Sequence, residues 1–536
     1  MPCPLCDSTQ LKKYGKLPNG SRKYVCQVCN NIFIDGIGEI CCNPEINFLR
    51  FKKRSIREIV TSQYYRHASN LRYLVSRINH TLEKINEIKT LIYENIILRL
   101  LGYIVLVVST IFISIVIALV NTYKLFQKSK DYILSYISNY KFWHGLAIIS
   151  FCATITFLVS YSISGNLDGR SGAMFYMQAE ALLQGRTNLD VTWTLDLIPF
   201  DGKLFLAIPP LNGFLMLPFV HFFGGRFTET VFSLVLYFLL IIVQFIYVEK
   251  FASSQKNSQR RLLFIFLTLG TMIFPCAVIA SSWFNAVLGS CLFLSLAWIT
   301  LYYAQGLKQD IFAITLLAIA SIGRFHLAVI FPAFILKAWF SRYAGNIKAL
   351  VALCVPAVMF IIFVAWWNWV RFGSPFSIKY EELLYADFFK ENIQKYGFRN
   401  LIYIFPNIYH GIIAIPKLVT QFPFFKIDDM GNGILAISPL FIYILRDKNR
   451  SDSWKNFAWL CMAIIAVPIF THCSTGWQQF GYRYFLDFFP FASFLLLKSR
   501  VNPTHLLPLT CILISLWFNM FGAVLFLNPE LFGAQS

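Results

Sequence analysis

Long apolar runs dominate the chain, and short polar or basic stretches separate them. A helix needs about 20 apolar residues to cross a bilayer, and runs of that order recur from residue 97 to residue 527. We place crossings at about 97–120, 142–163, 229–249, 262–281, 283–303, 311–340 (two helices), 347–370, 431–446, 456–472, 484–498 and 503–527. This pattern predicts an all-α polytopic membrane protein with about 11–13 transmembrane helices.

The composition agrees with this prediction. Of the 536 residues, 57% are hydrophobic and 14% are charged, whereas a soluble domain carries about 25% charged residues. The net charge of +20 would be unusual for a water-soluble protein that does not bind nucleic acid. In a membrane protein, lysine and arginine collect in cytoplasmic loops and set the orientation of the helices, so we assign most of the charge to topology.

Basic clusters in the connecting loops predict the orientation. They lie at residues 124–141, 250–261, 342–348, 446–450 and 498–500, and placing them inside leaves loops 164–228 and 371–430 outside. The sequence thus predicts a multi-pass protein of the cytoplasmic (inner) membrane whose active site faces the extracytoplasmic side. If 97–120 also crosses, the residues before it lie outside as well, and the sequence leaves their side open.

Two CxxC pairs near the start predict a structural zinc site. Each pair offers two thiolates to one tetrahedral ion, and we expect the zinc ligands to be Cys3, Cys6, Cys26 and Cys29. Zinc would stabilise a segment, residues 1–40, that is too short to have its own core. The alternative, a pair of disulfides, requires an oxidising compartment.

The spacing around the second CxxC resembles the zinc ribbon of insertion-sequence transposases. Asn19-Gly20, Tyr24 and Phe33 carry the resemblance, which covers about the first 35 residues. It implies contact of residues 1–35 with nucleic acid or with another protein, although no recombinase domain follows. Residues 45–96 form a basic linker with apolar residues at heptad spacing, which predicts a coiled coil or a helix that leads into the membrane. Residues 97–141 add a membrane segment and a basic loop.

Motifs in the predicted outer loops resemble C-type (GT-C) membrane glycosyltransferases, the superfamily of protein mannosyltransferases and lipid A aminoarabinose transferases. Asp168 follows a span, a stretch with the pattern of an amphipathic helix ends at Gly185, and Pro209-Pro210 comes later. Asn368 with Phe372-Gly373-Ser374-Pro375, and Trp477 with Gly481-Tyr482-Arg483-Tyr484, match later elements in the same order. The resemblance covers most of residues 142–530 and implies a sugar donor carried on polyprenyl phosphate, with an unknown acceptor.

Glycosyl transfer from a lipid phosphate needs a base for the acceptor hydroxyl and cations for the departing phosphate. Asp168, at the outer end of a span, is our candidate base, with Asp190 and Asp196 as second choices. A cation inside an apolar run is costly and therefore usually functional, which singles out Arg324, and the guanidinium of Arg483 suits phosphate oxygens. Our candidate substrate-binding residues are Arg324, Asn368, Lys379, Tyr380, Trp477, Arg483 and Tyr484.

Several absences shape the remaining alternatives. The sequence has no nucleotide-binding signature, which favours a lipid-linked donor and no nucleotide cofactor. His221, His326 and His410 are isolated in sequence, so we predict no catalytic metal triad and leave a catalytic metal open. A transporter or flippase of a lipid-linked solute is the main alternative function, and a membrane-tethered zinc-ribbon regulator is another.

Overall fold

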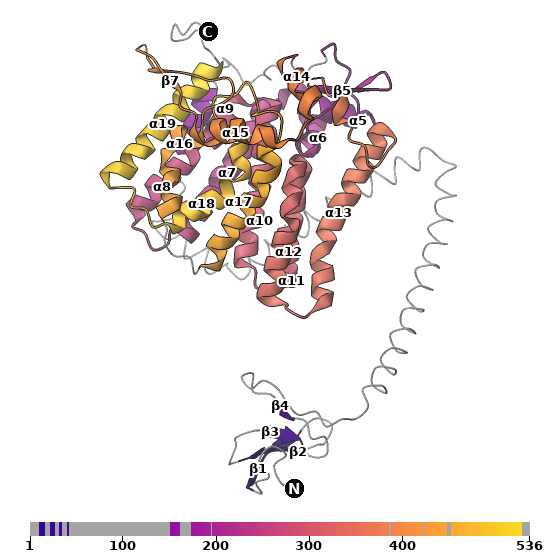
Figure 1. Ribbon diagram of the computed structural model, residues 1–536, viewed down its shortest axis with the longest axis vertical. Helices are drawn as coiled ribbons and strands as arrows, with labels where there is room; N and C mark the ends of the chain where they lie inside the picture. The colour runs from indigo at the N-terminus through magenta and orange to yellow at the C-terminus, as the bar shows by residue number, and fades with distance from the viewer. Residues whose placement is uncertain are drawn as a thin grey trace, which may run out of the picture. The chain divides into compact units, whose positions relative to one another are not determined.

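The computed structural model describes residues 10–16, 22–26, 32–34, 40–41, 151–160, 173–193, 196–384, 387–420, 422–446 and 452–527. The chain forms two compact units, Met1–Val116 and Ile117–Ser536, which are drawn in Figure 1. Each unit is considered by itself below.

The first unit contains a four-stranded antiparallel sheet. Its strands are β1 (Leu11–Lys16), β2 (Arg22–Cys26), β3 (Ile32–Ile34) and β4 (Ile40–Cys41), paired in sequence order. Cys26 ends β2 and lies opposite Leu11 in the register. The other predicted zinc ligands, Cys3, Cys6 and Cys29, lie outside the described residues, as do the predicted coiled coil within 45–96 and the span 97–120. The zinc site therefore stays a prediction.

The second unit is a bundle of apolar helices, which confirms a helical polytopic membrane protein. Among the described residues, seven helical segments are long and apolar enough to cross a bilayer, and three shorter apolar helices, Phe151–Ser160, Leu401–Ile413 and Phe489–Lys498, accompany them. The seven are α7 (Glu229–Phe251), α8 with α9 (Asn257–Ile279), α10 (Ser282–Tyr303), η2 with α12 (Phe325–Arg342), α13 (Ile347–Phe372), α17 (Ser453–Phe470) and α19 (Leu506–Leu527).

Four of the predicted runs are interrupted in the described structure, among them 262–281, which is α8 followed by α9, and 311–340, which we predicted as two helices. The run 311–340 breaks at Arg324, between α11 (Leu307–Gly323) and the 3₁₀ turn η2 (Phe325–Ile330). The run 431–446 is α16 (Ile434–Ile437) followed by the 3₁₀ segment η6 (Pro439–Arg446). The run 484–498 begins as the 3₁₀ turn η7 (Arg483–Asp487) before α18 (Phe489–Lys498). A proline restricts the residue before it: Pro439 lies at the start of η6, after α16, Pro490 at the start of α18, and Pro332 at the start of α12, after η2.

Short elements cover one end of the bundle (Figure 1). The segment between residues 173 and 223 folds into α5 (Met174–Leu183), the hairpin β5–β6 (Leu197–Phe200 and Lys203–Leu206) and α6 (Leu211–Phe223). The segment between residues 380 and 426 contributes η3 (Tyr380–Glu382), α14 (Asp387–Tyr396), η4 (Leu401–Tyr403), α15 (Ile404–Ile408), the π-helical turn η5 (Tyr409–Ile413) and the hairpin β7–β8 (Lys417–Leu418 and Phe425–Lys426).

A buried carboxylate fixes α5 to the bundle. Glu229, the first residue of α7, accepts hydrogen bonds from the backbone N–H groups of Phe175 (2.5 Å) and Tyr176 (3.1 Å). It also accepts one from Ser282 Oγ at 2.9 Å. The first turn of α5 has no acidic residue of its own, so Glu229 supplies the negative charge that a helix N-terminus favours.

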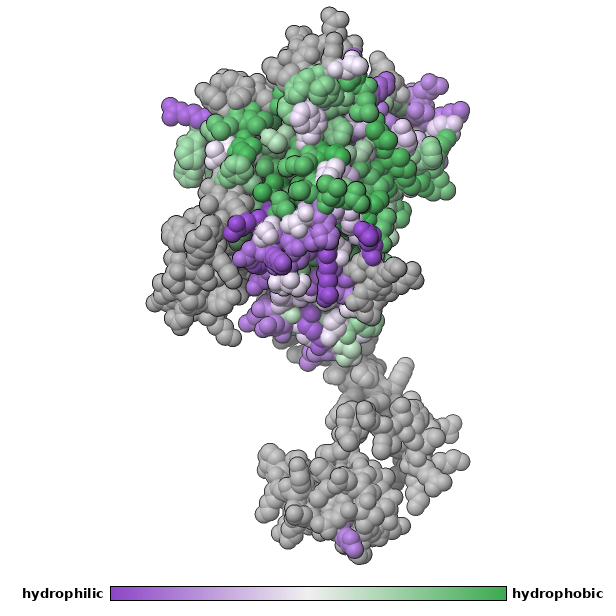
Figure 2. Space-filling view, turned by 90° about the vertical axis from the view of Figure 1, so that its left-hand side faces the viewer, coloured by the Kyte–Doolittle hydropathy of each residue, from purple (hydrophilic) through white to green (hydrophobic). Residues whose placement is uncertain are grey.

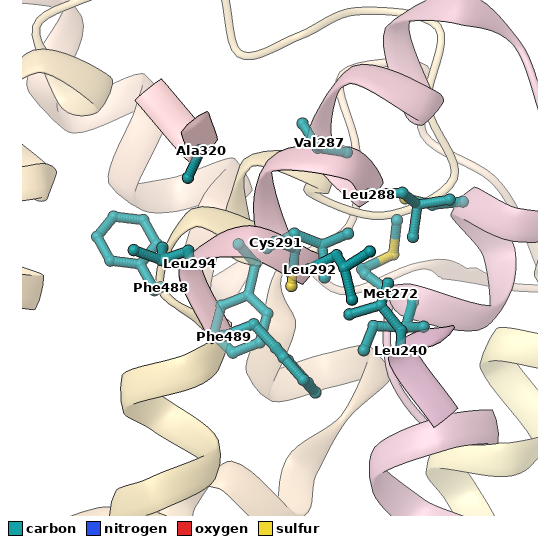
Figure 3. Close-up of a cluster of buried hydrophobic side chains, with 14 of the residues drawn as sticks. Leu240, Met272, Val287, Leu288, Cys291, Leu292, Leu294, Ala320, Phe488 and Phe489 are labelled. Carbon is teal, nitrogen blue, oxygen red and sulfur yellow. The ribbon is translucent and has the colours of Figure 1, made fainter. Parts of the chain in front are cut away.

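Helix α10 lies at the centre of the packing and contacts α6, α7, α9, α11 and α18. Figure 3 shows its residues Cys291, Leu292 and Leu294 in one buried cluster with Leu240 of α7 and Phe489 of α18. On the outer surface, hydrophobic residues cover the upper part of the face shown in Figure 2, with hydrophilic residues below. The most exposed helix, α13, has only 22% of its most apolar window buried inside the bundle, as expected for a helix that faces lipid.

The indole of Trp298 in α10 joins several helices, and its removal tests this core. The ring is fully buried and contacts five other rings, those of Phe334, Trp454, Phe457, Phe491 and Phe494, at centroid distances of 5.0–6.4 Å. We expect Trp298→Ala to lower the free energy of unfolding by about 3–5 kcal/mol, measured by thermal unfolding in detergent.

Trp298→Phe is the matched control. The indole Nε1–H is buried with no hydrogen-bond acceptor, so phenylalanine removes an unpaired donor and keeps a ring. We expect a change much smaller than that for alanine. Equal losses in the two variants would contradict the packing role of the ring.

Candidate active site

A cavity of about 510 Å³ opens at the end of the bundle that the short elements cover. Its walls come from hairpin β5–β6, the start of α10, the break between α11 and α12, the end of α13 and the end of α17. The lining residues are Ile198, Ala207, Pro209, Trp283, Arg324, Phe325, His326, Arg371, Ile378, Tyr380, Glu381, Phe398, Arg399, Pro468, Ile469, His472 and Tyr484.

The cavity combines cationic and apolar walls. Three arginines, Arg324, Arg371 and Arg399, line it, and Glu381 is the one carboxylate among its lining residues. Aliphatic and aromatic side chains make up much of the rest. Such a lining suits a ligand that carries both negative charge and apolar groups.

Asp487 orders the deepest charged residues of the cavity. Its carboxylate, with a fully buried side chain, accepts a hydrogen bond from Arg324 at 2.8 Å and lies 2.9 Å from His326 Nε2. Arg324 also lies over the ring of Tyr484, 4.5 Å from its centroid. The break after α11 makes this arrangement possible, because it places Arg324 and His326 at the bundle end and not within a continuous helix.

His326, which is isolated in the sequence, has a partner in the fold, the carboxylate of Asp487. Residues 326 and 487 are remote in sequence, so no local spacing could reveal the pair. The signal for Asp487 was available, since an acidic residue inside the predicted apolar run 484–498 is costly and usually has a partner.

Arg371 is held by neighbouring acceptors. It donates to Leu206 O at 3.2 Å and to Asn368 Oδ1 at 3.2 Å, and Asn368 in turn donates to Pro375 O at 3.4 Å. Asn368 is buried and is not among the lining residues. Its position thus favours a role in orienting Arg371 over direct substrate contact.

Asp196 and Arg483 both contact the indole of Trp283. Trp283 Nε1 donates to Asp196 Oδ2 at 3.0 Å, and the Arg483 guanidinium lies 6.0 Å from the indole centroid. Burial raises the pKa of Asp196, while the Trp283 hydrogen bond and the charge of Arg483 oppose that rise. Asp196 is only partly buried, so a carboxylate with a raised pKa lies next to a cavity-lining ring.

Arg483 itself is buried behind the cavity. Its guanidinium donates to Trp477 O at 3.1 Å and to Gln479 Oε1 at 3.3 Å, and it lies 5.3 Å from the centroid of Tyr484. The ring of Tyr484 therefore contacts both Arg324 and Arg483. These two predicted cations do come together, although only Arg324 lines the cavity.

The other predicted residues divide into two groups. Tyr380 and Tyr484 line the cavity. Lys379 lies over Phe200 at 5.3 Å, and Trp477 packs against Phe389 at 6.3 Å; neither is among the lining residues. Asp190 is 76% exposed and pairs with Arg186 at 2.7 Å, as an ordinary loop carboxylate does. Asp168 lies outside the described residues.

Two further cavity residues, Arg399 and His472, were not predicted from sequence. A β-bridge pairs Arg399 with His472, and Arg399 donates to Pro468 O at 2.9 Å. Burial lowers the pKa of His472 to about 4, and its Nδ1 accepts from Ser474 N at 3.2 Å. The same Nδ1 lies 3.3 Å from Ser474 O, and the lowered pKa leaves the imidazole neutral near pH 7. Neither residue belongs to a recognisable motif.

No group of three or more metal-ligating side chains occurs in the part of the chain that the structure describes. The chain matches no protein-family model, no curated protein and no solved structure. The geometry of the site is therefore the ground for any functional assignment.

The ion pair between Arg324 and Asp487 is expected to stabilise the fold, and substitution tests this. Removing one partner of a buried ion pair leaves an unpaired charge and costs about 3–5 kcal/mol. We expect Asp487→Asn to lower the melting temperature of the purified protein markedly, because Arg324 loses its counter-charge.

The double variant Arg324→Gln/Asp487→Asn provides the control, since it removes both charges. Its melting temperature should lie above that expected from adding the two single effects. Additive losses would show that the two side chains do not depend on each other.

Proposed function

We propose that the protein is a membrane glycosyltransferase that transfers a sugar from a polyprenyl-phosphate carrier to an acceptor at the extracytoplasmic face. The cavity carries the proposal. It combines three arginines with an apolar lining at the end of a bundle of membrane-crossing helices. A lipid-linked sugar phosphate presents the matching features, a phosphate beside a long apolar chain.

The reaction gives each part of the site a task. A carboxylate takes the proton of the acceptor hydroxyl, and the acceptor oxygen then attacks the anomeric carbon of the sugar. The bond from that carbon to the phosphate oxygen breaks, and the oxygen keeps the electron pair. Arg324 and Arg371 would stabilise the negative charge that develops on the phosphate.

Two carboxylates are candidates for the base. Asp168 is proposed from its place after a predicted span. Asp196 is supported by its raised pKa and by its hydrogen bond to Trp283. A base that works near neutral pH gains from a raised pKa, and a neighbouring cation such as Arg483 stabilises the ionised form that accepts a proton.

Substitution of the acids by asparagine tests the proposal. The assay incubates the purified full-length protein with a panel of radiolabelled polyprenyl-phosphate sugars and membrane lipid acceptors, and measures transferred label. We expect Asp168→Asn or Asp196→Asn to lower the transfer rate about a hundredfold or more, the usual contribution of a general base.

Asp190→Asn is the matched control, because Asp190 is exposed and paired with Arg186, and its rate should stay near that of the wild type. If wild-type protein moves the lipid-linked sugar across vesicle membranes without transferring it, the flippase alternative replaces this proposal. Full activity in both the 168 and the 196 variant would exclude these two bases.

The pH dependence of transfer separates the two bases. The Trp283 hydrogen bond holds the pKa of Asp196 down against the effect of burial. If Asp196 is the base, activity is lost as the pH falls through its pKa, and Trp283→Phe should shift this acidic limb to higher pH. The measurement is the transfer rate at saturating donor from pH 4 to pH 8. An unshifted limb would favour Asp168.

A further inference from the structure

A second surface of the protein, outside the cavity, exposes an unusual amount of apolar side chain. It runs from Leu401 through the hairpin β7–β8 and contains one short apolar helix, Leu401–Ile413, of the three that are too short to cross a bilayer. Its exposed residues are Leu401 (75%), Ile402, Phe405 (78%), Tyr409, Ile413, Ile415, Leu418 (75%), Phe422 and Phe424. We call this surface the 401–424 patch.

The short helix has two sharply different faces. Leu401, Phe405, Tyr409 and Ile413, four residues apart, are exposed, whereas Tyr403, Asn407 and Gly411, also four apart, are buried. The buried face is fixed to the bundle, because Asn407 Nδ2 donates to His472 O at 2.8 Å and to Phe470 O at 3.3 Å. The exposed apolar face is thus held in one orientation.

The hairpin extends the patch along a membrane-crossing helix. The rings of Phe422 and Phe424 lie 5.6 Å and 6.5 Å from that of Trp517 in α19, and Phe422 lies 5.1 Å from Phe521. Trp517 lies ten residues before Leu527, the last residue of α19. At 1.5 Å per residue, this corresponds to about 15 Å along the helix axis from that end. The patch is therefore continuous with the lipid-facing side of the bundle.

Two carbonyl groups of the hairpin have partners within the protein. Pro423 O accepts from Trp517 Nε1 at 3.2 Å, and Phe424 O accepts from Val419 N at 3.1 Å. In hydrocarbon, a backbone carbonyl without a partner costs several kcal/mol, so these two bonds lower the cost of placing the hairpin in lipid.

Lysines border the apolar residues. Lys417 and Lys426 are exposed and directly opposite each other in the β7–β8 register. Basic side chains next to a membrane surface attract anionic headgroups. Lysine beside exposed apolar residues is the pattern of elements that lie in a membrane interface.

We propose that the 401–424 patch is a lipid-binding element: the helix Leu401–Ile413 lies in the headgroup boundary, the hairpin tip inserts beside α19, and Lys417 and Lys426 bind anionic headgroups. Phe398 and Arg399 line the cavity and directly precede this helix. The element therefore sets the cavity at the level of the lipid headgroups. This inference does not depend on the proposed glycosyl transfer.

Photo-crosslinking to lipid tests the insertion. The full chain is placed in nanodiscs of equal parts phosphatidylcholine and phosphatidylglycerol, with benzoylphenylalanine at position 405 or 424. Position 351 in α13, where Val351 is 62% exposed, is the positive control. Position 394 on the polar helix α14, where Gln394 is exposed, is the negative control.

We expect lipid adducts at 405 and 424 in yields close to that at 351 and several-fold above that at 394. Adducts at 351 with none at 405 and 424 would overturn the proposal, and so would a crosslinked dimer of the chain in place of lipid. With the probe at position 418 and both lysines present, phosphatidylglycerol should make up a larger share of the adducts than of the nanodisc lipid. Lys417→Gln/Lys426→Gln should lower that share to the share in the nanodisc. If the share stays as high as with the lysines present, headgroup binding by these lysines is refuted.

Discussion

The charge balance around Asp487 is the constraint on which the candidate site depends. A guanidinium at the end of an apolar bundle is costly without a counter-charge, and Asp487 provides one at 2.8 Å while also holding His326. The guanidinium of Arg324, which also lies over the ring of Tyr484, is thereby held in one position. The cavity keeps a lining cation whose charge is balanced by a buried carboxylate.

The helix breaks make this pairing geometrically possible. Arg324 lies between α11 and the turn η2, and Asp487 ends the turn η7, directly before α18. In a continuous helix, each charged side chain would lie within an apolar helix face and not at the helix end. The short 3₁₀ turns η2 and η7 instead bring both charged groups to the end of the bundle where the loops fold. The same irregularities that shorten the helices therefore build the site.

The sequence alone predicted the membrane bundle but only some residues of the candidate site. The reason why a site residue was found or missed differs from one residue to the next. Apolar runs follow from composition, so α7, α10, α13 and α19 were predicted closely. Arg324 was found because an isolated cation in an apolar run is conspicuous. Asp487 was equally conspicuous and was overlooked. The contact of Asp196 with Trp283 depends on the fold of a long loop, and no local pattern encodes it. The Asp201-Gly202 turn of hairpin β5–β6, with φ of 50° and 67°, carried a hairpin signal in its Asp-Gly pair that was not used.

The cavity and the 401–424 patch impose related requirements on a ligand. Arg371 has Asn368 Oδ1 and backbone carbonyls as its acceptors, so its positive charge is not neutralised by a carboxylate in these contacts and stays available to an anion. The apolar lining next to it includes Pro468 and Ile469 from the end of the spanning helix α17. A soluble anion would bind the arginines and leave the apolar lining without a partner. A neutral lipid would contact the apolar lining and leave the arginines without a partner. The lipid-linked donor that we propose is anionic at its head and apolar beyond it, so it would satisfy both, and the proposed lipid contact of the 401–424 patch would place the cavity at the layer where such a donor presents its phosphate.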